Sequence, residues 1–174
     1  KIHLAHPDKV YINGVWAKPA GDTMFDVVSP HTEAVVISVA EAVEADIDAA
    51  VAAARQAFDK GPWPRLSPKQ RAEYLKKLSA ELDRRMPELI LAWTEQIGAL
   101  VTIAPFVVGA GKAVFDQYAD LANTFTWEER RPLRDGSGIG LVVQEPVGVV
   151  AAIAPWNNPF GIMASKLAAA LMAG

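Results

Sequence analysis

The segment Val147-Gly-Val-Val-Ala-Ala-Ile-Ala154 carries the clearest fold signal in the sequence, and Pro155-Trp-Asn-Asn-Pro-Phe160 follows it directly. The first segment is apolar at consecutive positions, which is typical of a parallel strand covered by helices on both faces. The residues from Phe160 to Ala173 predict a helix, with a proline in its first turn and a glycine at its end. A buried strand that turns into a helix predicts the α/β class, because it is the start of an open parallel sheet.

The residues before this strand predict an extended arm. Arg130–Gly140 is polar and rich in glycine, which favours a loop or an arm. The residues from Ile139 to Gln144 then alternate as a strand with one polar face, and Glu145-Pro146 interrupts its pairing.

The middle of the chain predicts a series of helices. Ser67-Pro-Lys-Gln70 is a helix start with a capping box, Pro87 breaks or restarts that helix, and Gly98 ends the next one. A longer helix is expected from Pro105 to about Phe125, with one apolar face made by Phe106, Ala110, Ala113, Val114, Gln117, Tyr118, Leu121 and Phe125. An earlier helix has a stripe expected to face the core: Ile47, Ala50, Val51, Ala54 and Phe58.

The first part of the chain predicts short strands. Tyr11–Trp16 is expected to form a hairpin, because Asn13-Gly14 suits a turn that needs two residues with positive φ. Two more strands are predicted around Thr23–Val28 and Glu33–Ala40.

Composition excludes several classes of protein. The 174 residues are 51% apolar and 21% charged with a net charge of −3, and no segment has the basic stripe that nucleic-acid binding needs. There is no cysteine, so the chain holds no thiolate metal site, and no other metal site is expected. The uncharged run Pro146–Ser165 is interrupted by proline and glycine, and no signal peptide is apparent, so we expect a soluble cytoplasmic protein without a membrane partner.

The candidate site is Asn157, which lies between the predicted strand and the predicted helix. Ligands of open α/β sheets bind at this edge, and an Asn amide can donate a hydrogen bond to a developing oxyanion. The alternative is a tight turn in which the Asn side chain bonds the backbone.

These residues resemble the aldehyde dehydrogenase superfamily. That family is typified by a Pro-Trp-Asn-x-Pro core, a Lys nine residues after the Asn, and a run of small residues ending in Ala-Gly, as at Lys166–Gly174. The hairpin Tyr11–Trp16, the segment Phe25–Pro30 and the helix ending at Phe58 agree in order and spacing. The resemblance implies the N-terminal part of that fold, with a Rossmann-like sheet, a helical layer and an oligomerisation arm.

The resemblance also implies roles for individual residues. Asn157 would stabilise the oxyanion of a thiohemiacetal, and Ala154, Pro155 and Trp156 would line the cleft for NAD or NADP. Lys166 would face the nicotinamide ribose and handle protons, although a plain surface lysine is the alternative. Asn158 departs from the hydrophobic residue often found there, and the resemblance gives it no role.

The division that the resemblance implies is 1–128 for strands and helices of the cofactor-binding domain, 129–146 for the arm, and 147–174 for the first core strand and helix. The family places its cysteine nucleophile, its glutamate base and further cofactor contacts downstream of residue 174. We therefore expect part of an NAD(P)-dependent enzyme that oxidises a small aldehyde to a carboxylic acid and forms a homodimer or homotetramer. The alternative is a non-catalytic truncated paralogue or assembly module that lacks the nucleophile.

Overall fold

The computed structural model describes residues 2–174. Their elements, in chain order, are β1 (Val10–Ile12), β2 (Val15–Ala17), β3 (Met24–Val28), β4 (Val35–Ala40), α1 (Glu44–Lys60), the short 3-10 helix η1 (Trp63–Arg65), α2 (Pro68–Arg84), α3 (Met86–Ile97), α4 (Ala104–Thr124), β5 (Glu128–Pro132), β6 (Ile139–Val143) and α5 (Pro159–Ala173). The strands pair only as three antiparallel hairpins within this part of the chain.

The first two hairpins follow the sequence closely. Asn13 and Gly14 have φ values of 52° and 80°, and the tight turn lets Tyr11 pair with Trp16 across β1 and β2. Both residues lie in the left-handed region that this turn type requires, so the predicted hairpin is confirmed. Strands β3 and β4 form the second hairpin, also as predicted.

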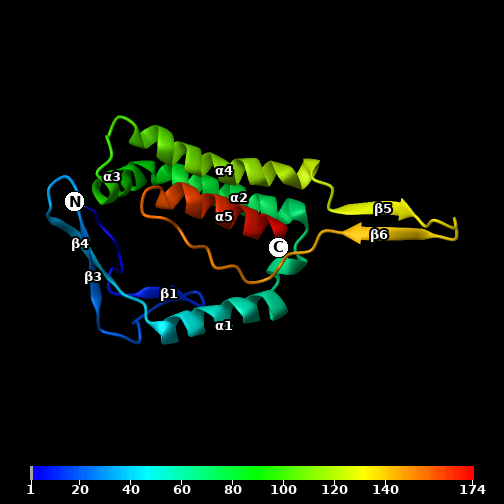
Figure 1. The fold of residues 1–174 in the computed structure, drawn as a ribbon, viewed down its shortest axis with the longest axis horizontal. Coiled ribbons are helices and arrows are strands. Elements are labelled where there is room, and N and C mark those ends of the chain that lie inside the picture. The colour runs from blue at the N-terminus through cyan, green and yellow to red at the C-terminus, as the bar shows by residue number, and fades with distance from the viewer. Residues whose placement is uncertain (1) are drawn as a thin grey trace.

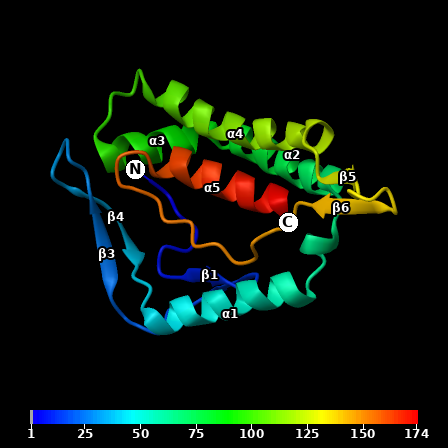
Figure 2. The same cartoon turned by 45° about the vertical axis from the view of Figure 1, so that its right-hand side comes forward.

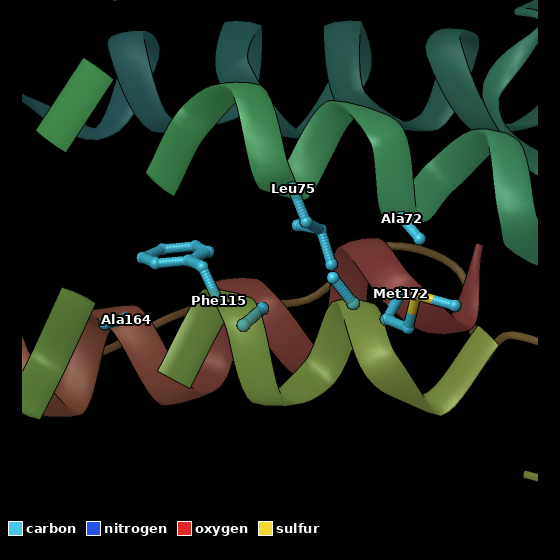
Figure 3. Packing of buried hydrophobic residues seen from close by; sticks show 7 residues of the cluster. Ala72, Leu75, Phe115, Ala164 and Met172 are labelled. Carbon is cyan, nitrogen blue, oxygen red and sulfur yellow. The ribbon is translucent and has the colours of Figure 1, made fainter. Parts of the chain in front are cut away.

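Helices α2, α3, α4 and α5 form a layer that holds the core of the described residues (Figure 1). Ser67 and Gln70 make the expected capping box, in which the Gln70 N–H donates to the Ser67 hydroxyl at 3.3 Å. Leu75 from α2 and Phe115 from α4 are buried against α5 (Figure 3). The last turn of α5 contributes Met172 to the same cluster.

The face of α4 that the sequence predicts to be apolar and buried is not the face that is buried in the structure. Phe106 is 79% exposed, whereas the buried residues of the helix are Ala104, Val108, Gly111, Phe115 and Ala119. This face contacts both α2 and α5, and its small residues allow the helices to approach closely.

Helix α1 lies apart from the helical layer, on the other side of the segment that precedes α5 (Figures 1 and 2). The prediction that its apolar stripe faces a core is therefore wrong for the described residues, since Ile47 and Val51 are each more than half exposed. Asp46, next to this stripe, is buried. Its carboxylate accepts from the N–H groups of Val43 and Ala20, which fixes the start of α1.

The arm is a hairpin of β5 and β6 that projects from one end of the helical layer (Figure 1). Glycine-rich residues were expected to form a loop or arm from Arg130, and β5 occupies the first part of that range. Nearly all residues of the two strands are exposed.

The expected parallel strand at 147–154 does not form, and no parallel sheet occurs among residues 2–174. The segment is extended chain between α1 and α5, with Val147 90% exposed and Ile153 78% exposed (Figure 2). A strand requires a neighbour for its backbone N–H and C=O groups, and none of the three hairpins pairs with this segment.

No helix in this part of the chain is both long enough and apolar enough to cross a membrane.

Candidate functional site

The candidate site is the bend that joins the extended segment to α5. Residues Ala154 and Pro155 end the extended chain, and 156–158 form the bend that precedes α5. The structure thus brings four of the five predicted site residues together, because they are consecutive in the chain.

Asn158 is the residue that starts helix α5. Its Oδ1 accepts a hydrogen bond from the Gly161 N–H at 3.2 Å, and Pro159 occupies the first helical position. This is the standard N-cap arrangement, which satisfies one of the N–H groups left free at a helix start. Sequence reasoning assigned Asn158 no role, although an Asn directly before a proline at a helix start is a recognisable capping signal.

Asn157 is exposed and takes no part in this cap. The alternative in which an Asn of this turn bonds the backbone is realised by Asn158, its neighbour. The Asn157 side chain is therefore exposed beside the helix start, where free N–H groups favour negative charge.

Trp156 lies against a different part of the molecule. Its indole is 81% exposed and lines a pocket of about 480 Å³ together with residues of β3, β4 and the end of α3, including Phe25 and Ile97. Ala154 is half-buried and Pro155 is exposed. This stretch lies outside the helices and strands and carries an exposed aromatic side chain.

Lys166 lies two turns into α5 and is exposed. At 100° per residue it stands opposite Ala164 and Ala168, the residues that pack into the helical layer. Its Cα is about 12 Å along the helix axis from that of Asn158, from eight residues at about 1.5 Å each. The structure does not bring Lys166 into contact with Asn157, so the two groups would meet different parts of a ligand.

A second pocket, of about 320 Å³, opens between α4 and the first turn of α5. Phe106, Val107 and Val114 line it from α4, and Asn158 and Ile162 line it from α5. None of its lining residues carries a charge.

The model of the aldehyde dehydrogenase family matches residues 16–174. The chain is similar to 3-succinoylsemialdehyde-pyridine dehydrogenase from a Pseudomonas species, with 38% identity over 94% of this chain and 33% of the relative. It is also similar to the NADP/NAD-dependent aldehyde dehydrogenase PuuC of Escherichia coli strain K12, with 33% identity over 99% of this chain and 35% of the relative.

Solved structures give the same result. A Mycobacterium tuberculosis aldehyde dehydrogenase complexed with NAD⁺ is 36% identical and superposes with a TM-score of 0.88, covering 96% of this chain and 34% of that protein. A betaine aldehyde dehydrogenase variant from Staphylococcus aureus, also with NAD⁺, is 28% identical with a TM-score of 0.92, over 98% of this chain and 34% of that one. The chain spans about a third of the length of the relatives it matches.

Proposed function

Because the chain belongs to the aldehyde dehydrogenase family, we propose that it is part of an NAD(P)-dependent enzyme that oxidises an aldehyde to a carboxylic acid. Related proteins were solved with NAD⁺, and one relative is named as NADP/NAD-dependent. The observation that carries the proposal is the difference between the two asparagines at the start of α5. Asn158 caps the helix, and the exposed Asn157 amide is left to act on a substrate.

The proposed role of Asn157 is to donate its Nδ2–H to the aldehyde oxygen as that oxygen becomes negatively charged. The Asn amide stabilises an oxyanion without gaining or losing a proton, so its contribution does not depend on pH near neutrality. The free N–H groups at the start of α5 add positive potential to the same place.

We propose that the residues before Asn157 contact the dinucleotide cofactor. In support, Ala154, Pro155 and Trp156 lie outside every helix and strand of the described residues, and Trp156 is mostly exposed. When bound, NAD(P)⁺ supplies the hydride acceptor for the oxidation. In this proposal the 154–156 backbone lines one wall of the cofactor site, and Lys166 lies at its ribose side and handles a proton there.

The reaction also needs a nucleophile that these 174 residues do not contain, since none of them is cysteine. We assign that group, which would form the thiohemiacetal, to further residues of the full-length protein. The relatives, which are about three times as long as this chain, leave room for it.

The arm is proposed to join subunits of a homodimer or homotetramer. Strands β5 and β6 pair only with each other among the described residues, so each keeps one free edge. Ile139 is 65% exposed and Leu141 is 59% exposed, and apolar side chains on a free strand edge favour pairing with another chain.

The test is steady-state kinetics of Asn157→Ala in the full-length protein. Loss of one oxyanion donor lowers kcat about 100- to 1000-fold in comparable acyl chemistry. The KM for the dinucleotide should stay close to its native value, because the 154–156 wall is intact. Asn123→Ala, at an exposed position on α4, is the matched control and should keep native turnover. Native turnover in Asn157→Ala would remove Asn157 from the oxyanion role.

A further inference from the structure

The tip of the first hairpin carries an asparagine followed by a glycine. Strands β1 and β2 end with the pair Ile12 and Val15, so Asn13 and Gly14 are the two turn residues outside the strand ladder. Both are exposed, and both lie in the left-handed region of backbone conformation. With alanines of α1 they line an open hollow of about 470 Å³. Solvent therefore reaches the side chain of Asn13 and the backbone nitrogen that follows it.

The Asn13 side-chain amide and the Gly14 backbone nitrogen are both free to react. Among residues 2–174, neither the Asn13 side chain nor the Gly14 N–H takes part in a hydrogen bond. Gly14 has no side chain to cover its own nitrogen. A Cβ at Gly14 would meet nothing within 4 Å, so the space around the turn is open. A five-membered ring that joins the Asn13 Cγ to the Gly14 nitrogen therefore has room to form.

The sequence contains one other acidic or amide residue directly before a glycine, Asp135, and the structure protects it. Its carboxylate accepts from the Ser137 hydroxyl at 2.7 Å and from the Ser137 N–H at 3.0 Å, and these bonds lower the pKa of Asp135. The Gly136 N–H donates to the Leu133 carbonyl at 3.0 Å. An ionised carboxylate is a poor electrophile, and a nitrogen whose N–H is bonded is a poor nucleophile.

The other asparagines of the sequence are also protected, each by the residue that follows. Asn158 precedes a proline, which has no N–H to lose. Asn123 lies in the last turn of α4, where the next N–H belongs to the helical hydrogen-bond ladder. Asn157 precedes a residue with a side chain of its own, which shields the backbone nitrogen. Asn13 is thus the asparagine that combines an unbonded nitrogen, a following glycine and open space.

We propose that Asn13 is a site of spontaneous covalent modification, at which the asparagine cyclises onto the Gly14 nitrogen and is converted to aspartate and isoaspartate. In the first step the Gly14 nitrogen attacks the Asn13 Cγ. A C–N bond forms to the Gly14 nitrogen, the bond from Cγ to Nδ2 breaks, and the proton of the Gly14 N–H leaves with Nδ2 as ammonia. The product is a succinimide ring.

Water then opens the ring without any change of oxidation state. Its oxygen bonds to one of the two ring carbonyl carbons, the bond from that carbon to the Gly14 nitrogen breaks, and a proton returns to the nitrogen. Attack at the Cγ gives aspartate, and attack at the main-chain carbonyl carbon gives isoaspartate. The reaction needs only water, so it does not depend on the proposed aldehyde oxidation.

The isoaspartate product is expected to open the hairpin. Its main chain runs through the former Asn13 side chain, which adds one methylene between Ile12 and Val15. The strands have only three residues each, and a tight turn sets their register. The aspartate product keeps the native main chain and tolerates the left-handed region, so it should keep the hairpin.

The experiment incubates the full-length protein in water enriched in heavy oxygen, at mildly acidic and mildly alkaline pH, and then digests it in ordinary water. Chromatography with mass spectrometry follows each asparagine. The Asn13 peptide should gain one labelled oxygen and split into aspartyl and isoaspartyl forms. Alkaline pH should speed the conversion, because the Gly14 nitrogen must lose its proton. Conversion should be at least about tenfold faster than at Asn123, whose neighbouring N–H must first open from the helix.

Asn13→Gln is the matched control. Its longer side chain would need a six-membered ring, so that peptide should stay unlabelled. A native Asn13 that stays unlabelled, or that converts no faster than Asn123, overturns the proposal.

Hydrogen exchange of the modified protein tests the effect on the hairpin. The amides of Ile12 and Val15 should exchange faster in the isoaspartyl form than in the aspartyl form, and equal exchange would overturn the predicted opening. The turnover of Asn157→Ala bears only on the proposed oxidation, so the two proposals can fail separately.

Discussion

The bend before α5 contains two neighbouring asparagines whose side chains have different surroundings. The side chain of Asn158 is held by the first turn of α5, whereas that of Asn157 is exposed and outside the cap. Capping fixes where the helix starts, and the helix start fixes the backbone that carries Asn157. The capping residue Asn158 thus fixes the position of the residue for which an oxyanion role is proposed.

Replacement of the cap gives a prediction for stability. Asn158→Ala should lower the free energy of unfolding by about 1 kcal/mol, the usual cost of losing an Asn cap. Asn158→Ser should cost only a few tenths of that, since Ser caps about as well. Urea denaturation of the two variants measures the difference. Equal stability of the alanine and serine variants would contradict the capping role.

At the scale of the element, α5 is held at its far end by a buried arginine. Arg71 of α2 is 5% exposed, its Nε donates to the Met172 carbonyl at 2.9 Å, and its Nη1 donates to the Leu66 carbonyl at 2.5 Å. Burial lowers the pKa of the Arg71 guanidinium below its usual range, although it stays charged. The positive group meets the carbonyl end of α5, where the helix dipole is negative.

Removal of that charge should loosen α5. Arg71→Met is expected to cost about 2–4 kcal/mol of unfolding free energy, because two carbonyls lose a charged donor. Arg71→Lys keeps the charge and should cost less than half as much. Guanidinium denaturation of both variants checks the order, and a methionine variant as stable as the native protein would refute the account of this contact.

Two glycines of α4 provide a matched pair. A Cβ at Gly111 would lie 2.8 Å from the Phe160 ring and 3.2 Å from the Gly161 Cα, whereas a Cβ at Gly109 would meet nothing within 4 Å. Gly111→Ala should therefore destabilise by about 1–3 kcal/mol through overpacking of α4 against α5. Gly109→Ala should stabilise by about 0.5–1 kcal/mol, as alanine does in helices. Thermal unfolding measures the change in stability of each variant. Changes of the same sign in the two variants would contradict the close approach of α4 and α5.

Lys112 of α4 joins two helices by ion pairs, with its Nζ 2.8 Å from Asp83 of α2 and 2.9 Å from Asp116. Hydrogen bonds to Asp83 and then Asp116 raise the pKa of Lys112. Burial works to raise the pKa of Asp116, but the bond from Lys112 helps to hold that pKa below its ordinary value of 3.8.

The pH dependence follows from these directions. A raised lysine pKa gives stability that is complete below its ordinary value of 10.5 and is lost as pH rises through the folded pKa. The lowered Asp116 pKa gives stability that is complete above 3.8 and is lost as pH falls through the folded pKa.

Lys112→Met should lower the free energy of unfolding by about 1 kcal/mol or less, because the ion pairs are partly exposed. Urea denaturation should show that cost at neutral pH and not in strong acid. A cost that persists in strong acid would point to packing instead.

Sequence signals that act within one turn predicted their elements well. Features that depend on long-range contacts could not be predicted from the sequence. Asn13-Gly14 and Ser67-Pro-Lys-Gln70 act within one turn, so the residues themselves determine the structure. The stripe of α1 and the apolar run at 147–154 need partners from elsewhere, and the described residues do not supply them. The orientation of α4 depends on two neighbouring helices, which the period of one helix does not reveal.

The candidate site shows the same limit. The position of Asn157 at a bend before a helix could be predicted from the order of apolar, proline and asparagine residues. The cap at Asn158 was not predicted, because the family resemblance gives this position no role. The pocket beside it arises where Gly111 and Gly161 let α4 and α5 meet, which sequence spacing alone does not show.

At the scale of the whole molecule, the apolar segment 147–154 lacks both a strand partner and a cover for its apolar side chains among the described residues. Val147 and Ile153 are mostly exposed, and α1 and α5 present apolar residues from either side. We predict that further residues of the full-length protein pair with this segment as parallel strands. Its amides should then exchange with solvent much more slowly than those of 133–138 in the arm turn. Equally fast exchange of the two segments in the full-length protein would contradict that pairing.

The most direct test is a crystal structure of the full-length protein with NAD⁺ and a covalently bound aldehyde adduct. The account predicts that the Asn157 Nδ2 lies about 3 Å from the oxygen of the adduct, the distance of an oxyanion donor. An Asn157 amide bonded to the main chain, with the adduct oxygen held by other groups, would contradict it.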